Sequence, residues 1–229
     1  MNQCRIKMLI QYKYLKKLEI SSQFGKILPI DIEPRDNFSI NRNDEIIYEL
    51  KNYIAKKEEP DYLWLNLRSN SEFYREFNNL ISKIKNIFPN LKIGAYANSL
   101  LFQYEEIPKS LSSCDVIAIN LNCVSSGKCS KICVFNENEK LTSQKMLNGI
   151  RDFQKNFNGY LSIYTILLGG INDSVEDIKA LRDFISELKP DQITLGELKG
   201  KAYKSISEEF KSFVENYFSD LPFDVSFNF

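Results

Sequence analysis

Residues 161–173 of the chain read LSIYTILLGGIND and join a strand signal to the start of a helix. The first eight residues are apolar, β-branched or aromatic in large part, which is typical of a buried β-strand. Gly169 and Gly170 then predict a tight turn with exposed backbone N–H groups, because glycine accepts a positive φ and lets other groups come close. An apolar stripe at helical spacing fills residues 175–188, and Asp173 is placed to cap that helix. A well-formed loop between strand and helix is the plain alternative to a ligand-binding turn.

The same alternation of strand and helix signals runs through the chain. Apolar runs of strand length cover residues 27–33, 62–67, 91–96, 115–121, 161–168, 192–195 and 223–229, and helical patterns cover residues 44–56, 73–88, 106–112, 142–157, 175–188 and 207–218. This order predicts an α/β fold with parallel strands joined by right-handed crossovers. An incomplete (β/α)6 barrel and a doubly wound sheet both fit, and either one binds ligands at the carboxyl ends of its strands.

No linker or composition shift divides the chain, so we expect a single domain over residues 1–229. Residues 1–23 form a small N-terminal β extension in this interpretation, residues 24–218 the partial barrel and residues 219–229 a C-terminal strand. That last segment alternates apolar and polar residues, which predicts an edge strand that pairs within the domain or with a partner chain.

Composition limits the classes of function. The 229 residues include 30 Lys and Arg and 30 Asp and Glu, so bulk charge does not favour strong nucleic-acid binding. Lys199, Lys201, Tyr203 and Lys204 form a short basic and aromatic run that could meet RNA, with a solvated loop as the alternative. The chain lacks the apolar core of a signal peptide and any run long enough to cross a membrane. We therefore expect a cytoplasmic protein without a membrane partner, whose cysteines are reduced.

Histidine is absent from the sequence. Histidine is the commonest general base and metal ligand, and its absence excludes Ser-His and Cys-His catalysis within the chain. Intrinsic chemistry would have to use Cys, Asp, Glu, Lys, Tyr or a cofactor.

Polar residues and glycines gather where the predicted strands end. Since the carboxyl ends of parallel strands meet at one edge of a sheet, these residues are candidates for a ligand pocket. Strand ends are also polar simply because they reach solvent, which is the alternative. The candidates are Asp31, Glu33, Asn66, Arg68, Asn98, Asn122, Gly169, Gly170, Asn172, Asp173 and Glu197. Asp31 with Glu33, and Asn120 with Asn122, are two residues apart and face the same way on their strands.

Three of the five cysteines, Cys123, Cys129 and Cys133, follow the strand at residues 115–121 with C-x5-C-x3-C spacing. Three thiolates would leave one iron of a [4Fe–4S] cluster open, although iron–sulfur sites use shorter spacings. Free or structural thiols and a disulfide are the alternatives. Cys114 precedes the same strand, so we expect it at the opposite end of the strand and out of reach.

The order of segments resembles a known family. The stretches DVIAINLN (115–122), LSIYTILLGGIND (161–173) and SVEDIKALRDFISELKPD (174–191) are similar to the second half of radical S-adenosylmethionine (SAM) proteins, with the closest likeness to the archaeal wyosine-synthase-like and cofactor-maturation branches. FGKILPIDIEP (24–34) resembles the entry strand of that family. The resemblance implies a partial barrel that holds a [4Fe–4S] cluster and SAM.

Two motifs of that family are missing here. The loop after the entry strand, which carries C-x3-C-x2-C in the family, has no cysteine between Arg35 and Arg42. The Gly-Gly-Glu-Pro-like motif, which takes the SAM amino group, is replaced by residues 67–71, which read LRSNS.

These departures lead us to expect a non-catalytic or repurposed scaffold, a pseudoenzyme without a cofactor. It would act as a binding or accessory protein through the strand-end pocket, alone or with a protein partner. One alternative is a redox enzyme whose cluster is held by Cys123, Cys129 and Cys133. Another is binding of SAM or a nucleotide without radical chemistry.

Overall fold

The structure is a computed structural model that describes residues 24–32, 42–56, 60–67, 71–125, 143–198 and 204–229. In these residues seven strands form one sheet, in which neighbours in sequence are neighbours in space and run parallel. The strands are β1 (Ile27–Ile32), β2 (Tyr62–Leu67), β3 (Lys92–Asn98), β4 (Val116–Asn120), β5 (Tyr160–Leu167), β6 (Gln192–Glu197) and β7 (Asp224–Asn228). A doubly wound sheet would reverse its strand order near the centre. The sequential order of an open sheet confirms the incomplete barrel, with six strand–helix units followed by β7.

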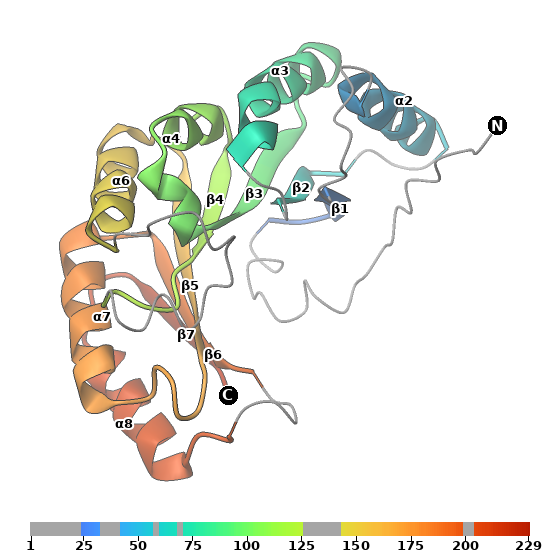
Figure 1. The fold of residues 1–229 in the computed structure, drawn as a ribbon. Helices are drawn as coiled ribbons and strands as arrows, with labels where there is room; N and C mark the ends of the chain where they lie inside the picture. Colours follow the sequence, from blue (N-terminus) through green and yellow to red (C-terminus); the bar gives the residue numbers. More distant parts are fainter. Residues whose placement is uncertain (1–23, 33–41, 57–59, 68–70, 126–142, 199–203) are drawn as a thin grey trace.

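Helices cover one side of this sheet. They are α2 (Arg42–Ile54), α3 (Ser71–Ile87), the 3₁₀ helix η2 (Ser99–Gln103), α4 (Glu106–Leu111), α6 (Ser143–Asn156), α7 (Val175–Leu188) and α8 (Glu208–Phe218). Figure 1 shows the α-helices following one another round the outside of the curved sheet. None of the helices that the structure describes is long and apolar enough to cross a membrane.

The described elements lie within a few residues of their predicted bounds, with two differences. The cap of α7 is Ser174 rather than Asp173: its side chain accepts a hydrogen bond from the Asp177 N–H, and Asp177 bonds back in a capping box. The other difference is η2, which the sequence interpretation did not include. The predicted N-terminal β extension lies outside the described residues. The C-terminal strand β7 pairs with β6 of the same chain.

Alternate residues of each strand serve the two faces of the sheet, as a period of two requires. On β2, Leu63 and Leu65 join the large core between sheet and helices. Tyr62 and Trp64 belong to a second cluster on the opposite face. We call this opposite face the inner face; it carries Tyr62, Trp64 and Asn66 of β2 and the residues in register with them on the other strands.

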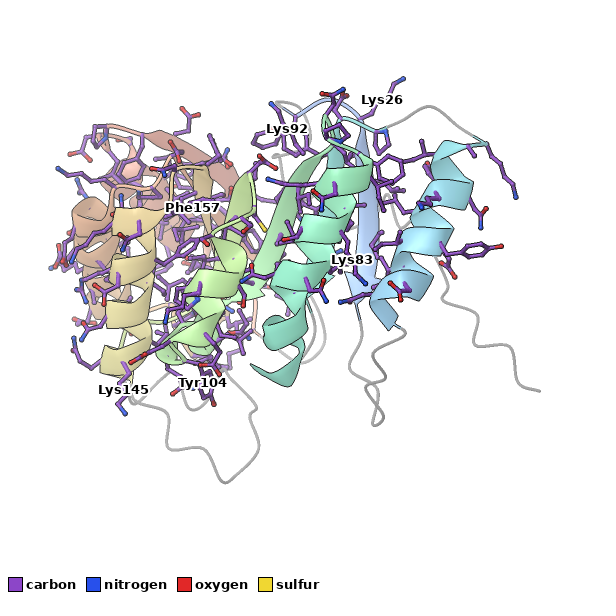
Figure 2. All side chains as sticks on the ribbon, turned by 90° about the horizontal axis from the view of Figure 1, so that it is seen from above. Lys26, Lys83, Lys92, Tyr104, Lys145 and Phe157 are labelled. Atoms are coloured by element: carbon purple, nitrogen blue, oxygen red, sulfur yellow. The ribbon has the colours of Figure 1, made fainter. Side chains whose placement is uncertain are left out.

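The two ends of the strands are well separated. Figure 2 shows Lys26 and Lys92 at the end where strands begin, and Tyr104 and Lys145 at the opposite end, where strands finish. Lys26 precedes β1 and Lys92 opens β3, whereas Tyr104 follows η2 beyond the end of β3. The predicted pocket residues belong to this second, carboxyl end.

Candidate ligand-binding site

The first predicted pocket residues stand at the ends of β1, β2 and β3. Asp31 lies in β1 next to Asn66 of β2 in the register of the sheet. Asn66 is half-buried at the end of β2. Asn98 ends β3, and its Oδ1 accepts a hydrogen bond from the Leu100 N–H at 3.0 Å, so it also caps η2. Glu33 and Arg68 lie outside the described residues.

The Gly-Gly turn after β5 has the backbone properties expected from its sequence. Gly170 has a φ of +82°, a conformation that favours glycine. Gly169 forms an antiparallel bridge with Lys204, and a Cβ at Gly169 would collide with the Lys204 carbonyl oxygen. This bridge thus holds the turn after β5 against the segment that leads into α8. Asp173 is half-buried in the same turn.

Asn172, in the same turn, uses its whole side-chain amide inside the protein. Its Oδ1 accepts from the Leu168 N–H at 2.6 Å. Its Nδ2 donates to the carbonyl oxygens of Asn122 at 2.7 Å and Ile166 at 2.9 Å. Asn172 is 3% exposed, so it ties the turn to the ends of β4 and β5 and offers nothing to a ligand.

Glu197 lies on the helix side of the sheet, away from the inner face. Its Oε1 accepts from the Ile206 N–H at 2.9 Å. Its Oε2 lies 3.1 Å from the Lys211 Nζ in an almost fully buried ion pair. Lys211 belongs to α8, so the structure assigns Glu197 to holding that helix and the segment before it.

Asn120 and Asn122 form the same-face pair that their spacing predicts. The Asn122 Nδ2 donates to Asn120 Oδ1 at 2.9 Å, and the Asn120 Nδ2 donates back at 3.2 Å. The Asn122 Oδ1 also accepts from the Ile166 N–H at 2.8 Å. The pair spans the end of β4 and fixes both amides beside β5.

The inner face carries a further set of polar residues that sequence reasoning missed in large part. The parallel register sets five of them side by side across β3 to β7: Asn98, Asn120, Tyr164, Thr194 and Ser226. We call them the polar row. The hydroxyls of Thr194 and Ser226 are 2.9 Å apart and hydrogen-bonded. A polar residue at every second position of otherwise apolar strands was the signal that could have revealed the row.

Two tyrosines frame the centre of this face. Burial raises the pKa of Tyr96 well above its usual range; the nearby Tyr164 raises it further, and a hydrogen bond to Asn120 acts in the opposite direction. Burial also raises the pKa of Tyr164. A Cβ at Gly196 would lie 3.2 Å from the Tyr164 hydroxyl oxygen, so glycine at this position makes room for that hydroxyl above β6. Both tyrosines therefore remain neutral hydroxyl groups at physiological pH.

Aromatic rings fill the inner face toward the amino ends of the strands. Phe24 packs against Tyr62 with ring centroids 5.0 Å apart and against Tyr160 at 5.4 Å. Trp64 is fully buried and lies over Gly94, where a Cβ would collide with its ring. The inner face is thus aromatic toward the amino ends of the strands and polar toward their carboxyl ends. We call the aromatic part, formed by Phe24, Tyr62, Trp64 and Tyr160, the aromatic floor.

The cysteines divide between the two ends of β4. Cys114 is buried at the amino end, and its burial raises the pKa of its thiol. Cys123 follows the carboxyl end, half-buried and disulfide-bonded, so in this form it carries no thiolate for iron. Cys129 and Cys133 lie outside the described residues. Among the described side chains no three Cys, Asp or Glu gather as a metal site.

A small cavity lies between the ends of β4 and β5 and the first turns of α7. Its volume of about 10 Å³ holds one water molecule at most. It is lined by Asn122, Cys123, Val124, Thr165, Leu167, Asn172, Asp177, Ile178 and Leu181. This space is too small for a ligand. The candidate site is instead the inner face, which carries the polar row.

Sequence comparison finds distant relatives. No model of a known protein family matches the chain. It is 25% identical over 216 residues to a protein named GTPase Obg of Brachyspira hyodysenteriae, covering 85% of this chain and 31% of that protein. It is 24% identical over 200 residues to a UPF0026 protein of Helicobacter pylori strain J99, covering 77% of this chain and 63% of the relative. The chain therefore spans less than two thirds of these relatives.

Structure comparison identifies the fold. A domain of pyruvate-formate lyase-activating enzyme from Bacteroides vulgatus matches with a TM-score of 0.57 and 17% identity, over 72% of this chain and 98% of that domain. SuiB of Streptococcus suis, in a structure bound to SAM, matches with a TM-score of 0.61 and 14% identity, over 95% of this chain and 51% of SuiB. A likeness at this level of identity shows the fold alone. The chain has a radical SAM-like fold.

Proposed function

We propose that this chain is a radical SAM-like scaffold that works as a binding or accessory protein, with its ligand on the inner face. The polar row supports this function, because it puts hydrogen-bonding side chains next to one another on five adjacent strands. Ligands of barrel-like α/β folds bind at this carboxyl half of the strands.

The titratable groups beside the row favour binding over catalysis. General acid–base catalysis works best with a pKa near the operating pH. On the central strands β3 to β6, the described titratable side chains beside the row are Tyr96 and Tyr164, whose pKa values are both raised. Neither tyrosine could accept a proton at neutral pH.

The decisive experiment asks whether the protein carries out cluster chemistry. The chain is purified without oxygen, treated with iron and sulfide, and examined by iron and sulfide assay and by its visible spectrum. It is then incubated with SAM and a reductant. We expect a colourless, iron-free protein that leaves SAM intact. Bound cluster together with reductive cleavage of SAM would overturn the proposal and favour the cluster enzyme with Cys123, Cys129 and Cys133.

Binding of SAM without cleavage would support the remaining alternative, a SAM-binding protein without radical chemistry. Isothermal titration of the purified chain with SAM measures this directly. Loss of the binding on Asn120→Ala, with retention on a surface control such as Asn216→Ala, would locate SAM on the inner face.

One observation favours an accessory role beside a GTPase. In the Brachyspira relative named GTPase Obg, the region similar to this chain makes up 31% of the protein. Two modules that share one chain in a relative are candidates to associate when they are separate. Size-exclusion chromatography of this chain with an Obg-type GTPase of its own host tests the idea, and a stoichiometric complex is expected. Separate elution at high protein concentration, with and without GTP, would exclude it.

A further inference from the structure

On the basis of the proposed function, we infer that the polar row selects an uncharged ligand with carbonyl or hydroxyl oxygens, and that the Tyr164 hydroxyl donates a hydrogen bond to it. The inference goes beyond binding as such, because it names the ligand's chemistry and an anchoring residue.

The position of the Tyr164 hydroxyl is the first step. Tyr164 stands in the middle of the row, between Asn120 of β4 and Thr194 of β6. Its hydroxyl oxygen lies over Gly196, 3.2 Å from where a Cβ would be. This places the oxygen above β6 on the inner face, where the missing side chain of Gly196 leaves it room.

The second step is that this hydroxyl is a spare donor in the middle of the row. Asn98 is engaged with the Leu100 N–H, and Thr194 with Ser226. Asn120 is hydrogen-bonded to Asn122. The Tyr164 side chain is half-buried, and its hydroxyl makes no hydrogen bond to any residue that the structure describes. A half-buried hydroxyl without a partner is readily satisfied by a ligand.

The third step concerns charge. Every residue of the row is uncharged, and so are the described neighbours in register above and below it on β5 and β6: Ser162, Ile166, Gln192 and Gly196. Asp224 lies one row lower on the edge strand β7 and is exposed. A charged group that left water beside Tyr164 would find no opposite charge on the described residues of β4, β5 and β6 at this level, which is costly. An uncharged polar group would lose far less.

The fourth step is the protonation state of the donor. Burial raises the pKa of Tyr164, so the hydroxyl keeps its proton at physiological pH. With its proton in place the hydroxyl can donate a hydrogen bond, and it therefore fits a carbonyl or hydroxyl oxygen of the ligand. Ile166, half-buried one row above, adds an apolar neighbour for the ligand's carbon skeleton.

A fragment screen by ligand-observed NMR tests this inference on the full chain. The library holds neutral, anionic and cationic fragments in equal numbers. Each hit is measured again with Tyr164→Phe, which keeps the ring and removes the donor. Tyr48→Phe is the matched control, because Tyr48 is 68% exposed on α2. A third variant, Gly196→Ala, sets a methyl group tightly against the hydroxyl.

We expect hits that weaken with Tyr164→Phe and Gly196→Ala but not with Tyr48→Phe, and we expect those hits to be neutral fragments with oxygen acceptors. The loss of one hydrogen bond predicts affinities about three- to tenfold lower. Both inner-face variants are checked for unchanged folding by circular dichroism, and Tyr164→Phe alone suffices if Gly196→Ala fails to fold.

Two results would overturn the inference. If the hits that depend on Tyr164 are charged, the inference falls but the binding scaffold stands. If no hit depends on Tyr164, then Tyr164 does not anchor the ligand and the inference is wrong. Cluster-dependent cleavage of SAM would instead contradict the proposed function. The fragment screen does not depend on that result, because it measures the charge preference of the polar row directly.

Discussion

The Asp115 carboxylate accepts a hydrogen bond from the Ile93 N–H at 2.8 Å and so joins the start of β4 to the start of β3. The same contact recurs at every second strand. Asp61, before β2, accepts from the Lys26 N–H at 2.7 Å, and Asp191, before β6, accepts from the Leu161 N–H at 2.7 Å. Each carboxylate accepts a hydrogen bond from a backbone N–H at the amino-terminal end of the sheet, where the preceding strand begins.

Removal of the Asp115 carboxylate is expected to destabilise the fold. Asp115→Ala leaves the Ile93 N–H without its partner, which costs about 1–3 kcal/mol. Asp115→Asn keeps an acceptor and should cost less. Urea unfolding followed by circular dichroism measures both. Asp152→Ala serves as the control, because Asp152 is 72% exposed and forms its ion pair with Lys155 on the same helix. Equal stability of the Asp115→Ala and Asp152→Ala variants would contradict the stabilising role of the Asp115 carboxylate.

Asn172→Ala is expected to be among the most damaging substitutions in the chain. It leaves the Leu168 N–H and the carbonyl oxygens of Asn122 and Ile166 without their partner, in a place with almost no access to water. We expect a loss of more than about 2 kcal/mol. Asn172→Asp keeps the acceptor but sets a carboxylate against two carbonyl oxygens, so it should not restore stability at neutral pH. Thermal unfolding checks both, and a stable Asn172→Asp protein would argue against this network.

Gly94→Ala tests the packing of the aromatic floor. A Cβ at Gly94 would meet the six-membered ring of the Trp64 indole, and such overpacking costs about 1–3 kcal/mol. The cost should fall when Trp64 is first replaced by Phe, because the ring atoms in question are then absent. Gly170→Ala is the comparison, since nothing lies within 4 Å of its Cβ position and only its φ of +82° is unfavourable. Independent effects of Gly94→Ala and Trp64→Phe in a double-mutant cycle would refute the contact.

The sequence predicted the elements of this fold because each strand has a clear apolar signal and each helix an apolar stripe. Strand 62–67 was predicted with the bounds that the structure shows, and α7 with its residues 175–188. The cap of α7 was misplaced by one residue, since Asp173 and Ser174 are both good caps and only the backbone geometry decides between them. Local pattern thus fixes type and approximate extent, and tertiary contacts fix the ends.

The candidate site was less accessible to sequence reasoning. Position at a strand end suggested that Asn172 and Glu197 face a pocket, but a side chain at a strand end can also be used by the protein itself. Asn172 joins β4 to β5, and Glu197 points to α8. Tyr164, Thr194 and Ser226 were hidden inside apolar runs, and only the register of five strands aligns them. The register depends on long-range pairing, which a single sequence does not display.

Tyr160 gives the protein a predictable weakness in alkali. Burial, followed by the charges of Asp224 and Asp191, raises its pKa from 10.0 to about 12. In the unfolded chain the phenol ionises near pH 10, whereas in the folded protein it resists until about pH 12. The folded state is therefore favoured in full below pH 10, and this contribution is lost as the pH rises from 10 to about 12.

Tyr160→Phe separates this effect from the general alkaline unfolding of the protein. The buried Tyr160 hydroxyl has no hydrogen-bond partner among the residues that the structure describes, so its removal should leave stability at neutral pH unchanged or slightly higher. Above pH 10 the variant should lose stability less steeply than the parent chain, and Tyr48→Phe should not differ from the parent. Urea unfolding across the pH range, with tyrosinate absorbance as a second readout, provides the measurement. A variant that is weaker at neutral pH would mean that the hydroxyl has a stabilising partner in solution. A variant that loses stability in parallel with the parent in alkali would mean that folding does not raise the pKa of Tyr160.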